Sequence, residues 1–319
     1  MKPETTGRPL FPPLVGLSFG IMAASTAAIF IRYAQVYAPS LVIAAYRLSL
    51  ATILLAPVAL YRQHEELRQL RGRALALALL SGFFLALHFA TWITSLEYTT
   101  VASSVVLVST SPLWVALLAP FTIREPLSRL ALWGMALALV GGVIVGLSDS
   151  CVFESGRLAC QLQGGSLLGD LLAVAGALMA AAYLLIGRRL RNNLSLISYI
   201  FVVYGMAAVV LLLLTVSARQ PFSGYPLKVY LWFLLLALVP QLLGHSSFNW
   251  ALRYLSAAFV SISLLGEPIG STLLAYFFLG ETPTALKIFG AILILAGIYI
   301  ASRSETAAAS KVASAQPEL

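Results

Sequence analysis

Charged side chains are scarce in this sequence of 319 residues, since 10% of them are Asp, Glu, Lys or Arg and 60% are hydrophobic. A soluble domain of this length needs far more charge on its surface. Apolar runs long enough to cross roughly 30 Å of hydrocarbon, at about 1.5 Å per residue of helix, recur along the whole chain. The composition therefore predicts a membrane protein.

The sequence also lacks the motifs of common enzyme sites. It has no Gly-x-x-x-x-Gly-Lys-Ser/Thr loop, no His-Glu-x-x-His pair and no Gly-x-Gly-x-x-Gly turn, and an intramembrane aspartate pair is absent. The two cysteines have no histidine nearby to complete a zinc site. We therefore expect no enzymatic activity, no catalytic residues, no metal and no cofactor.

Ten apolar segments are long enough to be transmembrane helices. They lie at about 14–34, 40–61, 74–95, 101–122, 128–147, 167–187, 195–217, 229–249, 256–279 and 283–301. The predicted fold class is therefore an all-α membrane protein with ten transmembrane helices.

The second half of the chain repeats the first. After a shift of 156 positions, Pro112 coincides with Pro268, and the other informative identities are Tyr98 with Tyr254, Glu125 with Glu281, Gly134 with Gly290 and Gly141 with Gly297. Ten helices in two copies mean five in each copy, and five is odd, so the second copy enters the membrane from the opposite side. We predict two inverted five-helix repeats, 14–147 and 167–301, with the binding site between them.

The basic residues predict the orientation in the membrane. With the N-terminus inside, 14 of the 20 Lys and Arg fall on the cytoplasmic side, 5 fall outside and Arg47 lies within the second helix. Both termini are therefore expected in the cytoplasm and the protein in the inner (cytoplasmic) membrane. This bias also explains the net charge of +8, so a nucleic-acid partner is not expected.

The remaining segments are two termini and one loop. Residues 1–13 are rich in Pro and residues 302–319 in Ala and Ser, so both are expected to be disordered. Cys151 and Cys160 lie in the predicted outer loop 148–166. An oxidising compartment favours a disulfide between them, and the alternative is two free thiols.

Each half ends with the same pattern, which consists of a proline, an apolar helix of small residues, a Glu turn and two glycines seven positions apart. The second half reads Leu-Gly-Glu-Pro-Ile at 265–269 and Leu-Gly-Glu-Thr at 279–282. This pattern resembles the drug/metabolite transporter superfamily, specifically the ten-helix EamA-like transporters with two tandem EamA domains. The resemblance covers 14–301 and implies a transporter without indicating its substrate. Two departures from the pattern are the turn Ile-Arg-Glu-Pro at 123–126 and the long loop 148–166.

Glu267 is the most informative polar residue at membrane depth. It lies in the middle of the ninth predicted helix, with Ser263 and Ser271 four residues to either side. A charged side chain there costs about 2.5–3.5 kcal/mol even on lenient insertion scales. Glu267 is therefore a candidate for proton coupling or for binding a substrate amine, and the alternative is a structural acid paired with Arg47 or the backbone. Ser111 is its counterpart in the first repeat.

Two equivalent helices carry polar stripes. Gln241, His245 and Asn249 follow each other at four-residue spacing in the eighth helix, and His88 and Trp92 do so in the third. We expect these stripes to face one another and to bind the substrate across the interface of the repeats. The alternative for each histidine is a structural role with satisfied hydrogen bonds.

Four further residues are candidates for the site. Arg47 is expected to pair with an acid, with snorkelling or gating as alternatives, and Tyr183 to donate a hydrogen bond. Pro112 and Pro268 lie near the middle of their helices, where a missing amide bends the helix. The bends are expected to act as hinges, to shape a cavity or to be simple kinks.

The polar residues also limit the substrate. The first helix lacks the Glu on which four-helix multidrug transporters depend, and only Arg47 is available to hold a phosphate. We therefore predict a secondary transporter, acting as an exporter of amino acids or amphipathic amines, by alternating access around a midplane cavity. The alternative is a membrane scaffold or sensor without flux, which the accessibility of a cysteine at position 249 would distinguish. The expected partners are a small-molecule substrate, the lipid bilayer and protons, and the chain is expected to act as a monomer or homodimer.

Overall fold

The computed structural model describes residues 12–98, 104, 107–123, 128–147, 151–154, 157–160, 167–279 and 285–314. These residues are helical except for one short hairpin and the connecting turns. The N-terminal segment 1–13 is expected to be disordered, and its residues 1–11 lie outside the described part of the chain.

The first half begins with one apolar span made of two helices. Helices α1 (Pro13–Ser25) and α2 (Ala27–Gln35) meet at Thr26, a single turn residue that keeps a helical backbone conformation. The elements that follow are α3 (Ser40–Arg62), α4 (His64–Gln69), α5 (Gly72–Tyr98), α7 (Ser111–Thr122) and α8 (Arg129–Leu147).

A short antiparallel hairpin separates the halves, with β1 (Cys151–Glu154) paired to β2 (Arg157–Cys160). The helices that follow it are α9 (Leu167–Arg191), α10 (Leu196–Ser217), α11 (Leu227–Leu236), the π-helix η1 (Ala237–His245) and α12 (Ser246–Ala251). The chain then continues through α13 (Ala257–Ser263), the 3₁₀ turn η2 (Leu264–Gly266), α14 (Glu267–Leu279) and α15 (Ala285–Ser314).

The apolar helices coincide with the ten predicted segments. Six of them in the described residues are long and apolar enough to cross a membrane: Pro13–Gln35, Ser40–Arg62, Gly72–Tyr98, Leu167–Arg191, Leu196–Ser217 and Leu227–Ala251. Four shorter apolar helices occupy the other predicted positions: Ser111–Thr122, Arg129–Ile144, Ala257–Ser271 and Ile288–Ala301. The all-α membrane fold is therefore confirmed, and the count of ten spans stays a prediction.

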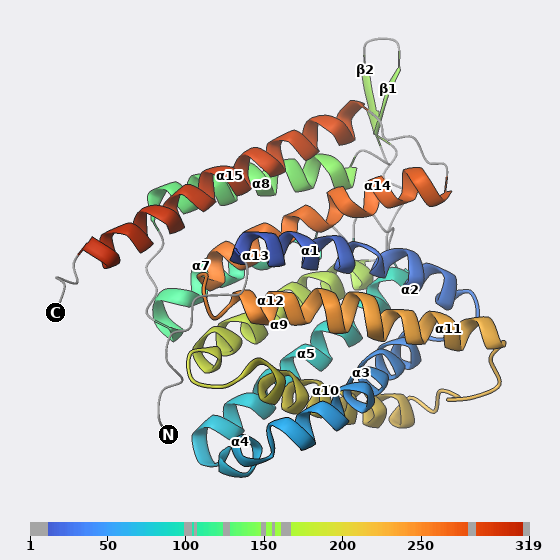
Figure 1. The fold of residues 1–319 in the computed structure, drawn as a ribbon. Coiled ribbons are helices and arrows are strands. Elements are labelled where there is room, and N and C mark those ends of the chain that lie inside the picture. Colours follow the sequence, from blue (N-terminus) through green and yellow to red (C-terminus); the bar gives the residue numbers. More distant parts are fainter. Residues whose placement is uncertain are drawn as a thin grey trace.

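Contacts between the halves follow a two-fold pattern. Helix α5 of the first repeat packs along α9 of the second, and α1 of the first repeat packs along η1 of the second. When each helix is replaced by its equivalent in the other repeat, the first of these contacts becomes the second. The equivalent helices α3 and α10 pack against each other, as do α8 and α15 (Figure 1). The helices of one half are therefore buried by those of the other half, and the core lies between the repeats.

The pair α8 and α15 forms one edge of the molecule (Figure 1). The glycines of the repeated pattern meet there, because a Cβ atom on Gly134 would lie 2.6 Å from the carbonyl oxygen of Gly297. A Cβ atom on Gly141 would lie 2.6 Å from the carbonyl oxygen of Gly290. The glycines thus allow the two backbones to approach more closely than any side chain permits.

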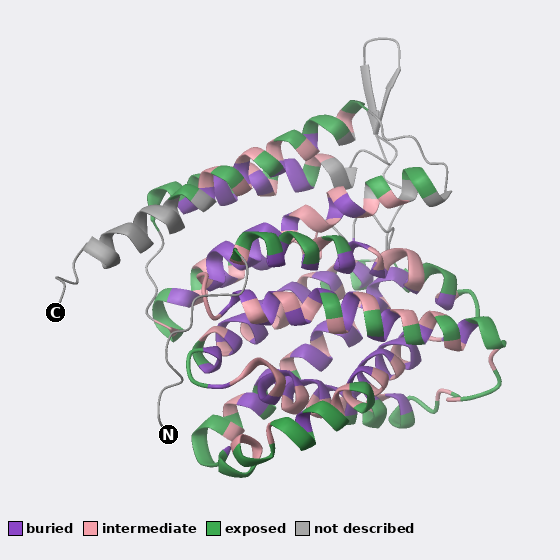
Figure 2. Ribbon diagram, viewed as in Figure 1, coloured by how far each residue is buried: buried purple, intermediate pink, exposed green. Residues whose placement is uncertain are grey.

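Apolar side chains also cover the outside of the bundle. Figure 2 shows buried residues on the inner faces of the helices and exposed residues on the outer faces. Large exposed side chains include Phe121, Trp133 and Phe277, which are 83%, 72% and 75% exposed. In water such a surface would aggregate, whereas hydrocarbon solvates it, so the exterior is that of a multi-pass membrane protein.

Two segments differ from the sequence expectation. Helix α15 continues to Ser314, where a disordered tail from 302 is expected, and the alanines at 307–309 and 313 account for this because Ala has the highest helix propensity. The loop 148–166 contains the hairpin, whose register places Cys151 opposite Cys160. The disulfide between them stays a prediction.

Candidate functional site

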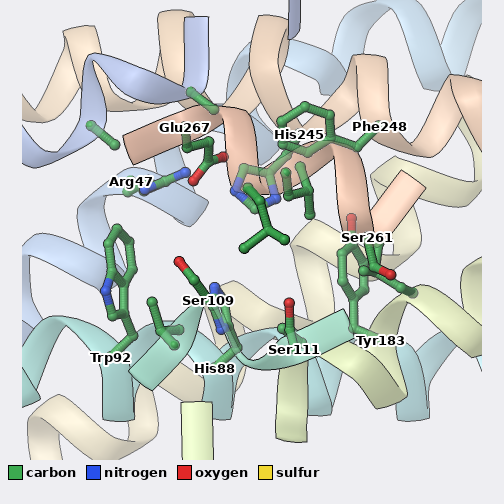
Figure 3. A pocket seen from close by; sticks show the side chains of 17 residues that line it. Arg47, His88, Trp92, Ser109, Ser111, Tyr183, His245, Phe248, Ser261 and Glu267 are labelled. Carbon is green, nitrogen blue, oxygen red and sulfur yellow. The ribbon is translucent and has the colours of Figure 1, made fainter. Parts of the chain in front are cut away.

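A cavity lies between the repeats and contains about 730 Å³ of unfilled space, including its opening. Its walls come from α1, α2, α3, α5, α9, η1, α12, α13 and the segments that precede Pro112 and Pro268 (Figure 3). Its polar lining consists of Arg47, His88, Trp92, Ser109, Ser111, Tyr183, His245, Ser261 and Glu267. A cavity that is mostly apolar and has a few convergent polar groups is typical of a small-molecule site.

Arg47 supplies the positive charge of the cavity and is 1% exposed. Its Nε atom donates a hydrogen bond of 2.8 Å to Oε1 of Gln241. The guanidinium carbon lies 4.2 Å from the centre of the Phe89 ring, which gives a cation–π contact. Its Nη1 atom is buried and has no hydrogen-bond partner among the described residues.

Glu267 supplies the negative charge and is the first residue of α14. Its carboxylate and the Arg47 guanidinium point into the same part of the cavity (Figure 3) and interact electrostatically. Within the described residues no hydrogen bond joins these two side chains. The expected interaction of Arg47 with an acid is therefore an electrostatic one with Glu267, whereas its direct contacts are with Gln241 and Phe89.

Rings form another wall of the cavity. His88 stacks on Trp92 with a centroid distance of 5.9 Å and an interplanar angle of 11°. Nδ1 of His88 is 3.0 Å from the carbonyl oxygen of Gly176, which fixes the ring. Nε1 of Trp92 is buried without a hydrogen-bond partner among the described residues. This wall thus offers an apolar surface with one unused N–H donor.

His245 lies on the opposite repeat, at the end of η1. Its ring contacts Phe89 at 5.2 Å and Phe248 at 5.4 Å between centroids. Nδ1 of His245 has no hydrogen-bond partner in the described part of the chain. The two histidines of the equivalent helices therefore reach one cavity, and one of them keeps a free ring nitrogen.

Gln241 and Asn249 lie behind the cavity lining, and both are 0% exposed. Gln241 holds Arg47, and Asn249 donates a hydrogen bond to the hydroxyl of Tyr183, a lining residue. The π-helix accounts for this, because its extra residue per turn rotates the predicted four-residue stripe. Proline at 240, which has no amide hydrogen, lies within this π-helix.

The helices that contain Pro112 and Pro268 are interrupted at equivalent places. Helix α7 begins at Ser111 after a turn at 109–110, and α14 begins at Glu267 after the 3₁₀ turn 264–266. Each proline is the second residue of its helix, where its missing amide is tolerated. Helices α7 and α14 therefore both start beside the cavity, and the role of the two prolines as hinges, as cavity-shaping bends or as simple kinks stays a prediction.

Hydrogen bonds join the start of α14 at Glu267 to the end of α1 at Ser25. Oγ of Ser25 donates to the carbonyl oxygen of Glu267 at 3.2 Å, and Oγ of Ser271 donates to the carbonyl oxygen of Ser25 at 3.0 Å. Ser263 bonds the backbone of its own helix at Phe259. The serines beside Glu267 thus serve helix packing, and neither belongs to the cavity lining.

Most predicted site residues come together. The cavity is lined by His88, Trp92, Tyr183, His245, Arg47 and Glu267. It is supported from behind by Gln241 and Asn249, which hold lining side chains, and Pro112 and Pro268 follow the turns beside it. Sequence reasoning missed Phe89 and Phe248, which look like ordinary apolar residues, and Ser109, whose signal was the polar run Ser109-Thr110-Ser111 before a proline. Cys151 and Cys160 lie on the hairpin, away from the cavity lining.

Comparison with solved structures shows the same fold. One crystal structure superposes with a TM-score of 0.73 over 92% of this chain and 97% of the other chain, at 18% sequence identity. At this identity the likeness concerns the fold alone.

Sequence relatives are transporters. The chain is 23% identical to the uncharacterized transporter YyaM of Bacillus subtilis (strain 168) over 262 residues, 81% of this chain and 83% of the relative. It is 25% identical to the uncharacterized transporter YxxF of the same organism, over 69% of this chain and 67% of the relative. The model of the EamA-like transporter family matches residues 13–147 and again 167–303. With two matched copies of that domain, the chain belongs to the EamA-like transporter family and is a membrane transporter, not an enzyme.

Proposed function

We propose that this protein is a secondary transporter that exports small metabolites, namely amino acids or amphipathic amines, across the inner (cytoplasmic) membrane. Both termini are cytoplasmic in this proposal, and the functional unit is a monomer or a homodimer. The fold accommodates one substrate at a time in the cavity between the repeats.

The observation that carries the proposal is the composition of that cavity. It combines one cation, one acid and several ring side chains in a space bounded by both repeats. A small substrate with a polar head and an apolar body matches these walls, because a few charged and polar groups lie among mostly apolar side chains. Phosphorylated substrates match poorly, since the lining contains a single Arg and no Lys.

Alternating access is supported by the helix breaks. Helices α7 and α14 start beside the cavity, and each follows a segment that departs from the regular α-helix, namely the turn at 109–110 and the 3₁₀ turn at 264–266. Such short turns absorb a change of backbone angle at low cost. A rocking motion at Pro112 and Pro268 would open the cavity to one side while closing it to the other.

Glu267 is the group that supports coupling to protons. It is the acid of the cavity lining, and it interacts with Arg47 without a hydrogen bond from that side chain. A carboxyl group in this position is able to take up a proton from one side and release it to the other as access alternates.

Flux measurement tests the proposed function. The purified protein is reconstituted in proteoliposomes, and efflux and uptake of labelled amino acids and amines are followed with and without a proton gradient. We expect exchange of at least one probe class, and accumulation that follows an imposed gradient. Absence of flux for every probe by a folded protein would favour the scaffold or sensor alternative.

A further inference from the structure

The Arg47 guanidinium is an incomplete hydrogen-bonding site. One edge is used by Gln241 and one face by Phe89, yet Nη1 has no acceptor among the described residues. Buried guanidinium groups are normally paired with a carboxylate, because an unsatisfied charged donor inside a protein is costly. The free edge therefore calls for an acceptor that the chain does not supply.

Gln241, the hydrogen-bond partner of Arg47, also has an unpaired donor. Its Oε1 accepts from Arg47, which fixes the amide so that Nε2 is the other end of the group. Nε2 is buried and has no hydrogen-bond partner in the described residues. Two adjacent side chains thus each keep one unused donor.

The nearby acid does not fill this site. Glu267 acts on Arg47 only through space, and its backbone oxygen accepts from Ser25. Arg47 and Gln241 thus present two unpaired donors on adjacent side chains, one of them charged, and this favours an anionic ligand group.

A carboxylate fits this arrangement better than a phosphate. It is planar and accepts two parallel hydrogen bonds from a guanidinium edge. A doubly charged phosphate would meet only one Arg and would be repelled by Glu267, which shares the cavity.

We propose that Arg47, held by Gln241, is an anchor for the substrate's carboxylate and that it makes this transporter select amino acids over the amines formed by their decarboxylation. This inference rests on the proposed transport function and decides between the two substrate classes named there. An amine that lacks the carboxylate leaves the guanidinium edge unsatisfied, so it binds more weakly.

Matched probes test the anchor. Proteoliposomes loaded with unlabelled probe are tested for counterflow of labelled L-leucine and L-phenylalanine, and for the corresponding amines 3-methylbutylamine and phenethylamine. Thermal stabilisation of the purified protein by each probe gives a second readout of binding. We expect a preference for the amino acid of about tenfold or more, the effect of one hydrogen bond to a charged group.

Two variants should change the preference in different ways. Gln241→Glu places a carboxylate against Arg47, so it should abolish stabilisation by the amino acids while retaining or improving that by the amines. Arg47→Lys keeps the charge without the planar fork and should reduce the preference. Gln241→Glu supplies the missing partner within the chain, so it is expected to fold at least as well as the wild type.

Two matched controls lie outside the cavity. Gln35→Glu introduces an acid at another glutamine, one that bonds Ser40 and the backbone of Ile93. Arg191→Lys alters another arginine that is 1% exposed, one that donates to the backbone of Asn249. Both alter buried hydrogen bonds and so test for a general loss of stability, and both should leave the ratio between amino acid and amine unchanged.

The outcomes are distinct. Equal counterflow and stabilisation by amino acids and amines in the wild type, or an unchanged ratio in Gln241→Glu, would overturn the anchor and leave the transport function standing. If no probe shows counterflow and no probe stabilises the protein, the proposed function and the anchor are both overturned.

Discussion

At the scale of single residues, the site depends on two opposite charges that share a cavity without a direct bond. Arg47 is held by Gln241 and Phe89, and Glu267, the first residue of α14, lines the same cavity. The Arg47 charge stabilises an anionic Glu267, whereas burial opposes it. The balance between these effects decides whether Glu267 exchanges protons during transport.

Replacing Glu267 tests proton coupling. Glu267→Gln keeps the size and hydrogen-bonding capacity of the side chain but cannot ionise. We expect the variant to lose accumulation driven by a pH gradient while retaining substrate exchange, because exchange needs alternating access but no net proton movement. Both activities are measured in the same proteoliposomes.

The equivalent position in the first repeat provides the control. Ser111→Ala alters a lining residue at the start of α7 and should keep gradient-driven accumulation. Parallel loss of exchange and accumulation in Glu267→Gln would point to substrate binding by Glu267, and unimpaired accumulation would rule out coupling through this residue.

Trp92 contributes a ring and an unused N–H group. Trp92→Ala removes the surface that stacks on His88 and should cut transport roughly tenfold or more, since burying an aromatic side chain is worth about 1.5–3 kcal/mol. Trp92→Phe keeps the stacking and should lose less. Initial rates of counterflow, normalised to the amount of folded protein, give the comparison, and equal rates in all three proteins would remove Trp92 from the site.

At the scale of elements, the sequence predicts most helices but not their interruptions. Long apolar runs and coincident prolines and glycines define the segments and the repeat, because these signals are local or periodic. The π-helix at 237–245, which contains Pro240, interrupts the regular four-residue spacing of the predicted stripe, so that His245 lines the cavity while Gln241 and Asn249 lie behind it. Phe89 belongs to the site only because α3 brings Arg47 over its ring.

The α8–α15 pair depends on its glycines. Gly134→Leu would push a side chain into the backbone of Gly297, since even a Cβ atom there would lie 2.6 Å from its carbonyl oxygen. We expect such overpacking to cost about 1–3 kcal/mol or to separate the two helices. Gly142→Ala is a suitable control, because its Cβ atom would meet nothing closer than 3.8 Å. Thermal unfolding in detergent measures both, and similar melting temperatures would contradict the close packing.

The register of the hairpin predicts a disulfide between its two cysteines. Cys151 and Cys160 are directly opposite in the antiparallel register, and such pairs have Cα atoms about 4.5–5.5 Å apart, within the range that a disulfide spans. In intact cells, a membrane-impermeant thiol reagent should label the protein only after reduction. Labelling without reduction would show free thiols, and labelling only after permeabilisation would place the hairpin inside.

At the scale of the whole molecule, one carboxylate joins the two repeats at an end of the bundle. Glu66 on α4 of the first repeat accepts a hydrogen bond of 2.9 Å from the backbone amide of Ser195, the N-cap of α10 in the second repeat. Its other oxygen accepts from the hydroxyl groups of Ser195 and Ser198. Helix α4 lies at the end of the bundle away from the hairpin (Figure 1), which is the predicted cytoplasmic end. Alternating access requires contacts of this kind to break when the cavity opens to that side.

Weakening this contact should therefore shift the population of conformations. Glu66→Ala removes the carboxylate that accepts hydrogen bonds from Ser195 and Ser198 at the N-terminus of α10, at a cost to this state of about 0.5–2 kcal/mol. The cavity should then open to the cytoplasm more often, and by up to roughly thirtyfold, because 1.4 kcal/mol corresponds to a factor of ten in population.

A cysteine introduced at Ser261, in the cavity lining, reports the change when Cys151 and Cys160 are replaced by Ser. In inside-out vesicles it should react with an impermeant thiol reagent faster in Glu66→Ala than in the parent. Glu65→Ala alters the neighbouring acid, which has no part in these hydrogen bonds, and should leave the rate unchanged. Equal rates for the parent and Glu66→Ala would show that the contact stabilises the fold without holding the cytoplasmic side closed.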